Sequence, residues 1–306
     1  MKTTILSIAL LFNLISFSQN ILITDEKKEE IKNYIQHLED NDQIMGTVSI
    51  FENGNETFNS TFGEINTSAK NKQNRTYAIG SQTKMFVAIL LAKLQEEQKL
   101  SFSDKLSDYF SEMPNAEKIE LNQMLNHTSG LKDYVSKSDS LHYWLKEPRT
   151  KKEIMGEIKS QGVAFEPGDS LRYSNSGYYL LARILEKEYE KSFKKVLENE
   201  IINPLDLKNT FAIDETNQPK NRAKSYEKEN KDWNEIEEFY YPNASGAGDI
   251  FSTPFDMNTF LVALFNGEII EKELLESMLP KNKVAFGKGI MIVPFYEHNG
   301  YGHGGD

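Results

Sequence analysis

Eight consecutive apolar residues, from Met85 to Ala92, place the strongest constraint on how this chain folds. A helix that is apolar on nearly every side belongs in a core rather than on a surface. Ser81 and Lys84 stand directly before this run, three residues apart. If both belong to the helix, they share one face, and the lysine amine is within reach of the serine hydroxyl. The sequence therefore predicts a buried helix that places a serine beside a lysine.

The chemistry of such a pair depends on burial. A serine hydroxyl is a weak nucleophile, and a lysine with its ordinary pKa of about 10.4 is a weak base near neutrality. Burial disfavours the charged ammonium and lowers the pKa, which makes the amine available as a base. The spacing alone carries little information, because Ser-x-x-Lys also begins at Ser129, Ser192 and Ser225. At Ser81 two interpretations stay open, a catalytic nucleophile and a helix N-cap.

Two further polar groups stand far along the chain. One is Tyr173-Ser174-Asn175 and the other is His303-Gly304-Gly305. A tyrosine that faces the serine could pass its proton to a leaving group, and an asparagine could hold a substrate carbonyl. Glycines on a strand allow a close backbone approach and can present an N–H group to a developing oxyanion. Taken alone, these residues are also compatible with a buried tyrosine, a turn asparagine and a glycine-rich tail.

In this order, the three groups resemble those of the serine penicillin-recognising enzymes. The match is closest to the branch that holds class C β-lactamases, D-alanyl-D-alanine carboxypeptidases of the same type and related esterases. Connecting segments resemble further markers of that branch, at residues 124–131, 204–210 and 248–253. The resemblance runs from about Ile31 to Asp306 without a long gap.

The resemblance implies a role for each of four side chains. Ser81 would be the acylated nucleophile and Lys84 its base partner. Tyr173 would be the second acid/base group, and Asn175 would contact the substrate. Such a serine acts by acyl transfer, in which an acyl-enzyme forms and is then hydrolysed.

The same resemblance assigns the end of the chain to substrate binding. His303 and Gly305 would lie on the substrate-binding strand, and the backbone N–H groups of Ser81 and Asp306 would form the oxyanion hole. His303 stands where penicillinases carry the lysine of Lys-Thr-Gly, so a permanent cation is lost and efficient penicillin hydrolysis is not expected. The other histidines are expected to be structural or surface residues: His37, His127, His142 and His298.

The fold class implied is an α+β sandwich of the β-lactamase/transpeptidase-like type, with helices flanking an antiparallel sheet. The domain would span residues 19–306 and include a mainly helical subdomain at about 104–240. Sequence patterns predict a hairpin over residues 46–62 around the turn pair Asn53-Gly54, a helix over 254–266 and a strand near 290–293. Thr24 is placed to cap an amphipathic helix. The expected packed face of that helix holds Ile31, Tyr34, Ile35 and Leu38.

Members of the family continue beyond the His-x-Gly strand through two more strands and a final helix, whereas this sequence stops at Asp306. We therefore expect a truncated or incomplete version of a longer protein. The missing strands would lie between the His-x-Gly strand and the N-terminal hairpin. Their loss would leave unpaired strand edges and an uncovered apolar face.

Composition excludes several classes of protein. The net charge is −11, which argues against a nucleic-acid or anionic-membrane partner. Cysteine is absent, so disulfides and thiolate metal sites are excluded, and no residue pattern implies a metal or organic cofactor. Residues 1–18 predict a secretory signal, with Lys2, an apolar run, and small residues at Ser16 and Ser18. No later segment is long and apolar enough to span a bilayer.

We therefore expect a secreted or periplasmic serine hydrolase. Its substrate would be a small molecule or peptide, either a D-Ala-D-Ala-type peptide or a small ester, with a β-lactam less favoured. Two alternatives stay open. The chain could be a non-catalytic protein of the same fold that binds peptidoglycan peptides, or an inactive truncated product. The oligomeric state is not predicted.

Overall fold

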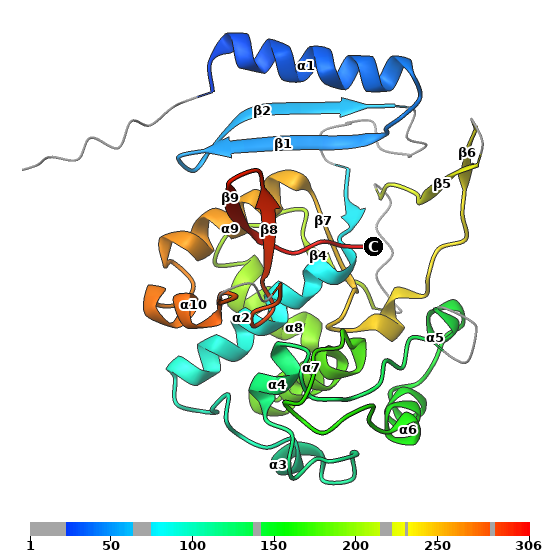
Figure 1. Ribbon diagram of the computed structural model, residues 1–306, viewed down its shortest axis with the longest axis vertical. Helices are drawn as coiled ribbons and strands as arrows, with labels where there is room; N and C mark the ends of the chain where they lie inside the picture. The colour runs from blue at the N-terminus through cyan, green and yellow to red at the C-terminus, as the bar shows by residue number, and fades with distance from the viewer. Residues whose placement is uncertain (1–22, 64–74, 137–141, 215–221, 230–231, 282–284) are drawn as a thin grey trace, which may run out of the picture.

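The computed structural model describes residues 23–63, 75–136, 142–214, 222–229, 232–281 and 285–306 (Figure 1). The predicted signal segment, residues 1–18, lies outside this part of the chain. The α-helices are α1 (Asp25–Asp40), α2 (Thr83–Glu96), α3 (Ser107–Phe110), α4 (Leu121–Leu125), α5 (Tyr143–Lys146), α6 (Lys151–Gln161), α7 (Asn175–Tyr189), α8 (Phe193–Leu197), α9 (Pro254–Asn266) and α10 (Lys272–Met278). Short 3-10 turns are η2 (Gly80–Gln82) and η4 (Tyr241–Ala244), and η3 (Glu198–Ile202) is a π-turn.

The strands form small antiparallel sheets. They are β1 (Gly46–Glu52), β2 (Asn55–Phe62), β3 (Tyr77–Ala78), β4 (Phe211–Ala212), β5 (Tyr226–Glu229), β6 (Asp232–Glu235), β7 (Ile250–Ser252), β8 (Met291–Phe295) and β9 (His298–Gly302). In the described residues, β3, β7 and β4 form one sheet with β7 in the middle, and three hairpins pair β1 with β2, β5 with β6 and β8 with β9. The expected single sheet is therefore divided, because no described strand bridges the N-terminal hairpin and the β8–β9 hairpin.

Helix α2 is the centre of the core. Every residue from Thr83 to Ala92 is buried, which confirms the prediction from the apolar run. The ring of Phe86 stacks on that of Phe260 from α9, with ring centroids 4.2 Å apart. On its other side α2 contacts α7, which is buried along most of its length. The helix is fixed from both sides, and so is the short turn that precedes it.

The N-terminal segment forms a separate layer above this core (Figure 1). The predicted hairpin is confirmed: Asn53 and Gly54 both adopt positive φ, at +50° and +79°, as a tight hairpin turn requires. Thr24 caps α1 as expected, its hydroxyl accepting from the Lys27 amide. The predicted inward face of α1 is only partly correct, because Ile35 is buried while Tyr34 is 64% exposed. The two residues are adjacent and point about 100° apart on a helix.

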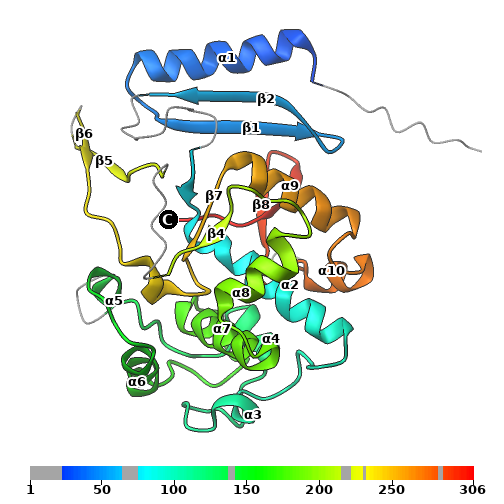
Figure 2. The same ribbon diagram turned by 180° about the vertical axis from the view of Figure 1, so that it is seen from behind.

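Strands as well as helices occupy residues 104–240. Helices α3 to α8 are found there, and β4, β5 and β6 are additions that the sequence did not suggest. β4 joins the central sheet through β7, and β5 and β6 form a projecting hairpin (Figure 2). Among the described residues, no helix is both long and apolar enough to cross a membrane.

Candidate active site

Ser81 lies in the 3-10 turn η2, directly ahead of the buried helix α2. Gly80 precedes it with a backbone φ of +51°, a value that residues other than glycine rarely adopt. A Cβ atom at Gly80 would lie 2.4 Å from the backbone oxygen of Asp306 and 2.8 Å from its nitrogen. The turn therefore presents Ser81 at the point where the C-terminal segment crosses it.

Lys84 is completely buried below Ser81. Its Nζ lies 3.0 Å from Ser81 Oγ, and it donates to Asn175 Oδ1 and to the Ala247 carbonyl, each at 2.8 Å. Burial lowers the pKa of Lys84 from 10.5 to about 7, and the nearby charge of Asp133 partly opposes this shift. The amine is therefore largely neutral just above neutral pH, which is the state that a general base requires.

Tyr173 comes from the loop immediately before α7, and Asn175 is the first residue of that helix. The Tyr173 hydroxyl donates to Ser81 Oγ at 2.6 Å. Burial raises the pKa of Tyr173 above its usual value, so this hydroxyl keeps its proton at neutral pH. The amide of Asn175 donates to Asp133 Oδ2 at 2.9 Å, which leaves its oxygen directed at Lys84. Ser81, Lys84, Tyr173 and Asn175 therefore form one connected group.

The C-terminal segment closes one side of this group. His303, Gly305 and Asp306 line a cavity of about 520 Å³ that Ser81, Tyr173 and Asn175 also line. His303 Nδ1 hydrogen-bonds to the Gly304 carbonyl at 2.5 Å, and burial lowers the pKa of its imidazole to about 4. His303 is therefore neutral at physiological pH, in agreement with the expected loss of a permanent cation at this position.

Gly305 passes close to the segment before Ser81. A Cβ atom at this glycine would lie 2.0 Å from the carbonyl oxygen of Ile79. In both ribbon views the C-terminus lies beside β3 (Figures 1 and 2). Because Gly305 has no side chain, its backbone can pack directly against the backbone of Ile79. This contact brings Asp306 to the Ser81 turn.

The structure adds three residues that the sequence analysis did not assign to the site. Asp133 orients Asn175, and the Ala247 carbonyl accepts from Lys84. His142, expected to be structural or on the surface, lines the cavity. No local pattern marks these residues, because each belongs to a loop that only the tertiary fold brings to Ser81.

His127 has the structural position that was expected. Its ring packs on Tyr173 with ring centroids 4.4 Å apart, and its Nδ1 accepts from the Ser174 amide at 3.3 Å. Burial lowers the pKa of His127 to about 3, so its imidazole is neutral near pH 7. His37 is exposed on α1 and His298 is exposed on β9.

The polar group around Ser81 is thus a candidate serine active site on an α+β fold. The family model described as Beta-lactamase matches residues 31–305. The chain belongs to the Beta-lactamase family.

Two solved structures have a fold similar to that of this chain. D-amino acid amidase from Ochrobactrum anthropi SV3 is 26% identical, with a TM-score of 0.78 over 90% of this chain and 85% of that one. D-stereospecific amidohydrolase from Streptomyces sp. is also 26% identical, with a TM-score of 0.73 over 89% of this chain and 86% of that one. These similarities confirm the expected fold class.

The name of a curated relative also refers to hydrolysis at a D-amino acid. Teichoic acid D-alanine hydrolase from Staphylococcus aureus (strain MRSA252) is 26% identical over 262 residues. The match covers 83% of this chain and 62% of that protein. The chain therefore spans less than two thirds of the length of this relative.

Proposed function

We propose that this chain is a serine hydrolase in which Ser81 attacks the carbonyl of an amide or ester and becomes acylated. The observation that carries this proposal is the position of Ser81 Oγ, within hydrogen-bond distance of both Lys84 Nζ and the Tyr173 hydroxyl, at 3.0 and 2.6 Å. Neutral Lys84 takes the Ser81 proton as the oxygen attacks. Tyr173 gives its proton to the departing amine or alcohol, and the Lys84 ammonium restores the tyrosine proton.

The oxyanion hole is assigned to the backbone N–H groups of Ser81 and Asp306. Support comes from the contact between the Gly80 turn and the Asp306 backbone, which brings the two residues to one side of the cavity. Each such donor typically contributes on the order of 10²–10³ in rate. Water then attacks the acyl-enzyme with the same two side chains in reversed roles.

The substrate proposed is an ester or amide of a D-amino acid with a free amino group. The described residues that line the cavity include Asp133 and no lysine or arginine. A cavity lined by this carboxylate and by no lysine or arginine favours a substrate ammonium over the carboxylate of a β-lactam or a peptide C-terminus. The choice of the D-configuration rests on the names of the relatives, which are a D-amino acid amidase, a D-stereospecific amidohydrolase and a D-alanine hydrolase.

Export of the chain is also proposed. It rests on the charge at Lys2, the apolar run and the small residues Ser16 and Ser18, with cleavage after Ser18. The teichoic acid substrate in the name of the staphylococcal relative agrees with a site of action outside the cytoplasm.

The test compares hydrolysis of D-alanine methyl ester, L-alanine methyl ester, N-acetyl-D-alanine methyl ester and a chromogenic cephalosporin, with Ser81→Ala as control. We expect the free D-ester to react fastest, and all activity to disappear in the control. Equal rates for the N-acetylated ester, or a faster reaction of the cephalosporin, would contradict the substrate proposal. No hydrolysis of any ester by the folded chain would contradict the hydrolase proposal and favour a binding protein.

A further inference from the structure

One turn separates the active-site cavity from a second cavity. We call residues 244–249 the wall turn. Ala244, Ala247 and Gly248 line the active-site cavity, whereas Ser245 and Asp249 line a cavity of about 520 Å³ on the other side. The wall turn touches the active site chemically as well, because its Ala247 carbonyl accepts a hydrogen bond from Lys84 Nζ. Whatever fixes this turn also fixes one acceptor of Lys84.

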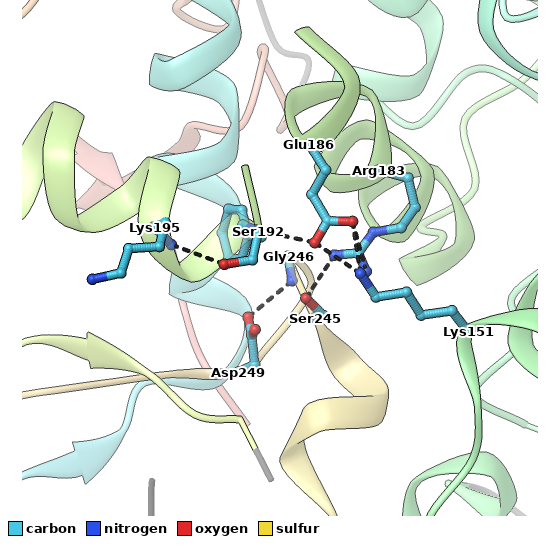
Figure 3. A network of polar contacts seen from close by, with 9 residues as sticks. Lys151, Arg183, Glu186, Ser192, Lys195, Ser245, Gly246 and Asp249 are labelled. Carbon is cyan, nitrogen blue, oxygen red and sulfur yellow. Dashed lines mark hydrogen bonds and ion pairs between the residues drawn. The ribbon is translucent and has the colours of Figure 1, made fainter. Parts of the chain in front are cut away.

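Asp249 is a buried carboxyl that the proposed acyl transfer does not use. It is 2% exposed, and its Oδ1 accepts from the Gly246 amide at 2.8 Å, so it closes the wall turn from within (Figure 3). Burial raises the pKa of Asp249 from 3.8 to about 7. A buried carboxyl is costly unless its hydrogen bonds offset the loss of water. The hydrogen bond to Gly246 therefore gives Asp249 a structural role, which is to hold the wall turn.

A polar network extends from Asp249 to the surface. The Ser245 hydroxyl, which partly offsets the raised pKa of Asp249, accepts from Arg183 Nη2 at 2.8 Å. Arg183 also pairs with Glu186 at 3.3 Å, and Glu186 pairs with the exposed Lys151 at 2.8 Å (Figure 3). Arg183 and Glu186 both belong to α7, the helix that begins at Asn175. The network thus joins the wall turn to the helix that supplies another Lys84 partner.

Gly246 limits movement of the turn on the opposite side. Its φ is +79°, and a Cβ atom there would lie 2.3 Å from the Cβ of Ala182 on α7. The backbone is therefore pressed against α7, and its amide is held by Asp249. Little freedom remains for the Ala247 carbonyl, which follows directly in the chain.

We propose that Asp249 is a positioning residue that holds the Ala247 carbonyl against the Lys84 amine. The inference rests on the proposed function, in which Lys84 is the base. Asp249 touches neither the substrate nor Ser81, and it acts through the backbone of the wall turn. An acceptor of this kind favours the ammonium form of lysine, so its loss lowers the pKa of Lys84.

The variants used in the test leave the other charged and titratable groups around Lys84 and Asp249 in place. Charged or titratable groups that face Lys84 are Asp133, His127, His303, Tyr173 and Tyr178. Those that face Asp249 are Arg183, Tyr134 and Tyr179.

The experiment measures the pKa of Lys84 directly by NMR titration of the chain labelled with ¹³Cε-lysine. The Lys84 signal is assigned by its loss in Lys84→Met. In Asp249→Ala the pKa of Lys84 should fall by about one pH unit, since a hydrogen bond to a charged group is lost. Asp249→Asn keeps an oxygen acceptor for the Gly246 amide and should keep the Lys84 pKa close to that of the wild type.

Lys151→Gln is the matched control, because it breaks the outer end of the network without reaching the wall turn. It should leave the pKa of Lys84 unchanged. If Asp249→Ala does not fold, Asp249→Ser replaces it, since the hydroxyl is too short to reach the Gly246 amide. A folded Asp249→Ala or Asp249→Ser variant with the wild-type Lys84 pKa overturns the proposal. So does an equal shift in Lys151→Gln, which would show general loosening.

Acylation by a fluorophosphonate is recorded on the same samples at pH 8.5. Lys84 is neutral at this pH in both chains, so we expect a several-fold lower rate in Asp249→Ala, because an amine of lower pKa is a weaker base, and recovery in Asp249→Asn. The two proposals remain distinguishable, because the NMR titration does not depend on activity. If the Lys84 pKa falls in Asp249→Ala as predicted but the wild-type chain never becomes acylated, the hydrolase proposal is refuted and the positioning role of Asp249 remains supported.

Discussion

Lys84 determines when the proposed nucleophile can react. Its amine must be neutral to accept the Ser81 proton, and burial brings its pKa down to about 7. A lysine with its ordinary pKa would be almost fully charged at that pH. The chain thus obtains a base near neutrality by burying an amine among uncharged hydrogen-bond acceptors. That burial also has a cost in folding free energy, which falls as the amine loses its proton.

The rate of acylation should therefore follow the titration of Lys84. Below about pH 7 it should increase about tenfold per pH unit, and above that pH it should level off as the amine becomes neutral. The measurement is kcat/KM for an activated ester between pH 5 and 9. His303→Gln is the matched control: it should lower the rate but keep the same midpoint, because the His303 pKa of about 4 lies well below it. A midpoint that moves in this control would assign the titration to the histidine.

The same shift has a consequence for stability. The folded chain holds the Lys84 proton less tightly than the unfolded chain does. Between about pH 7 and 10.5 the unfolded state therefore binds more protons, and the contribution of Lys84 to the free energy of unfolding increases with pH.

At the residue scale, the sequence predicted the side chains that lie on or beside helices. The spacing and the apolar run marked Ser81 and Lys84 as a candidate pair, whereas the roles of Tyr173 and Asn175 were expected only from the resemblance to the family. Asp133 and Ala247 were not predicted, because their part in the site depends on loop backbones that meet only in the folded chain.

Among the elements, the segment 303–306 has the most direct effect on the site. It crosses the turn that carries Ser81, and Gly305 permits that crossing because a side chain there would collide with the Ile79 carbonyl. A small change in this segment displaces Asp306, to which half of the proposed oxyanion hole is assigned. The element therefore couples backbone packing to the proposed oxyanion hole.

Gly305→Ala should lower kcat by on the order of 10², because the added methyl group pushes Asp306 away from Ser81. Gly302→Ala is the matched control, since a Cβ atom at Gly302 meets nothing within 4 Å. Both variants are compared by steady-state kinetics and by thermal unfolding. Equal activity in the two variants would argue against a role for the close approach at Gly305.

The predictability of each element depended on its length and pattern. The hairpin β1–β2 and the helices α1, α2 and α9 have clear turn pairs, caps or apolar runs, and all were predicted. The strand β4 has two residues, and β5 and β6 are mostly polar, so neither carries a readable pattern. Their pairing is fixed by tertiary contacts, above all the contact of β4 with β7.

For the whole molecule, stability and site geometry share one source, the core around α2. Side chains of this helix are buried between α7 and α9, and its N-terminal end carries the nucleophile turn. Unpaired edges on the N-terminal hairpin and on the His-x-Gly strand were expected, but the three-stranded sheet of β3, β7 and β4 was not predicted, because it joins strands distant in sequence. Apolar residues at the turn of the β8–β9 hairpin are exposed, with Phe295 at 66% and Tyr296 at 94%.

Phe86→Ala should reduce the free energy of unfolding by about 3–5 kcal/mol, because it removes a fully buried ring that stacks on Phe260. Urea denaturation followed by circular dichroism measures this loss. The control is Phe255→Ala, at a ring that is 48% exposed on α9, the helix that also carries Phe260. It should lower the free energy of unfolding much less. Similar losses in both variants would contradict the central place of α2 in the core.

The central claim is that Ser81 is an activated nucleophile in this chain. Intact-mass analysis after exposure to a fluorophosphonate tests it most directly, with Ser81→Ala and Lys84→Met measured in parallel. The account predicts a single adduct in the wild type, none in Ser81→Ala and a much slower one in Lys84→Met. A folded wild-type chain that gains no mass, or an adduct that persists in Ser81→Ala, would contradict it.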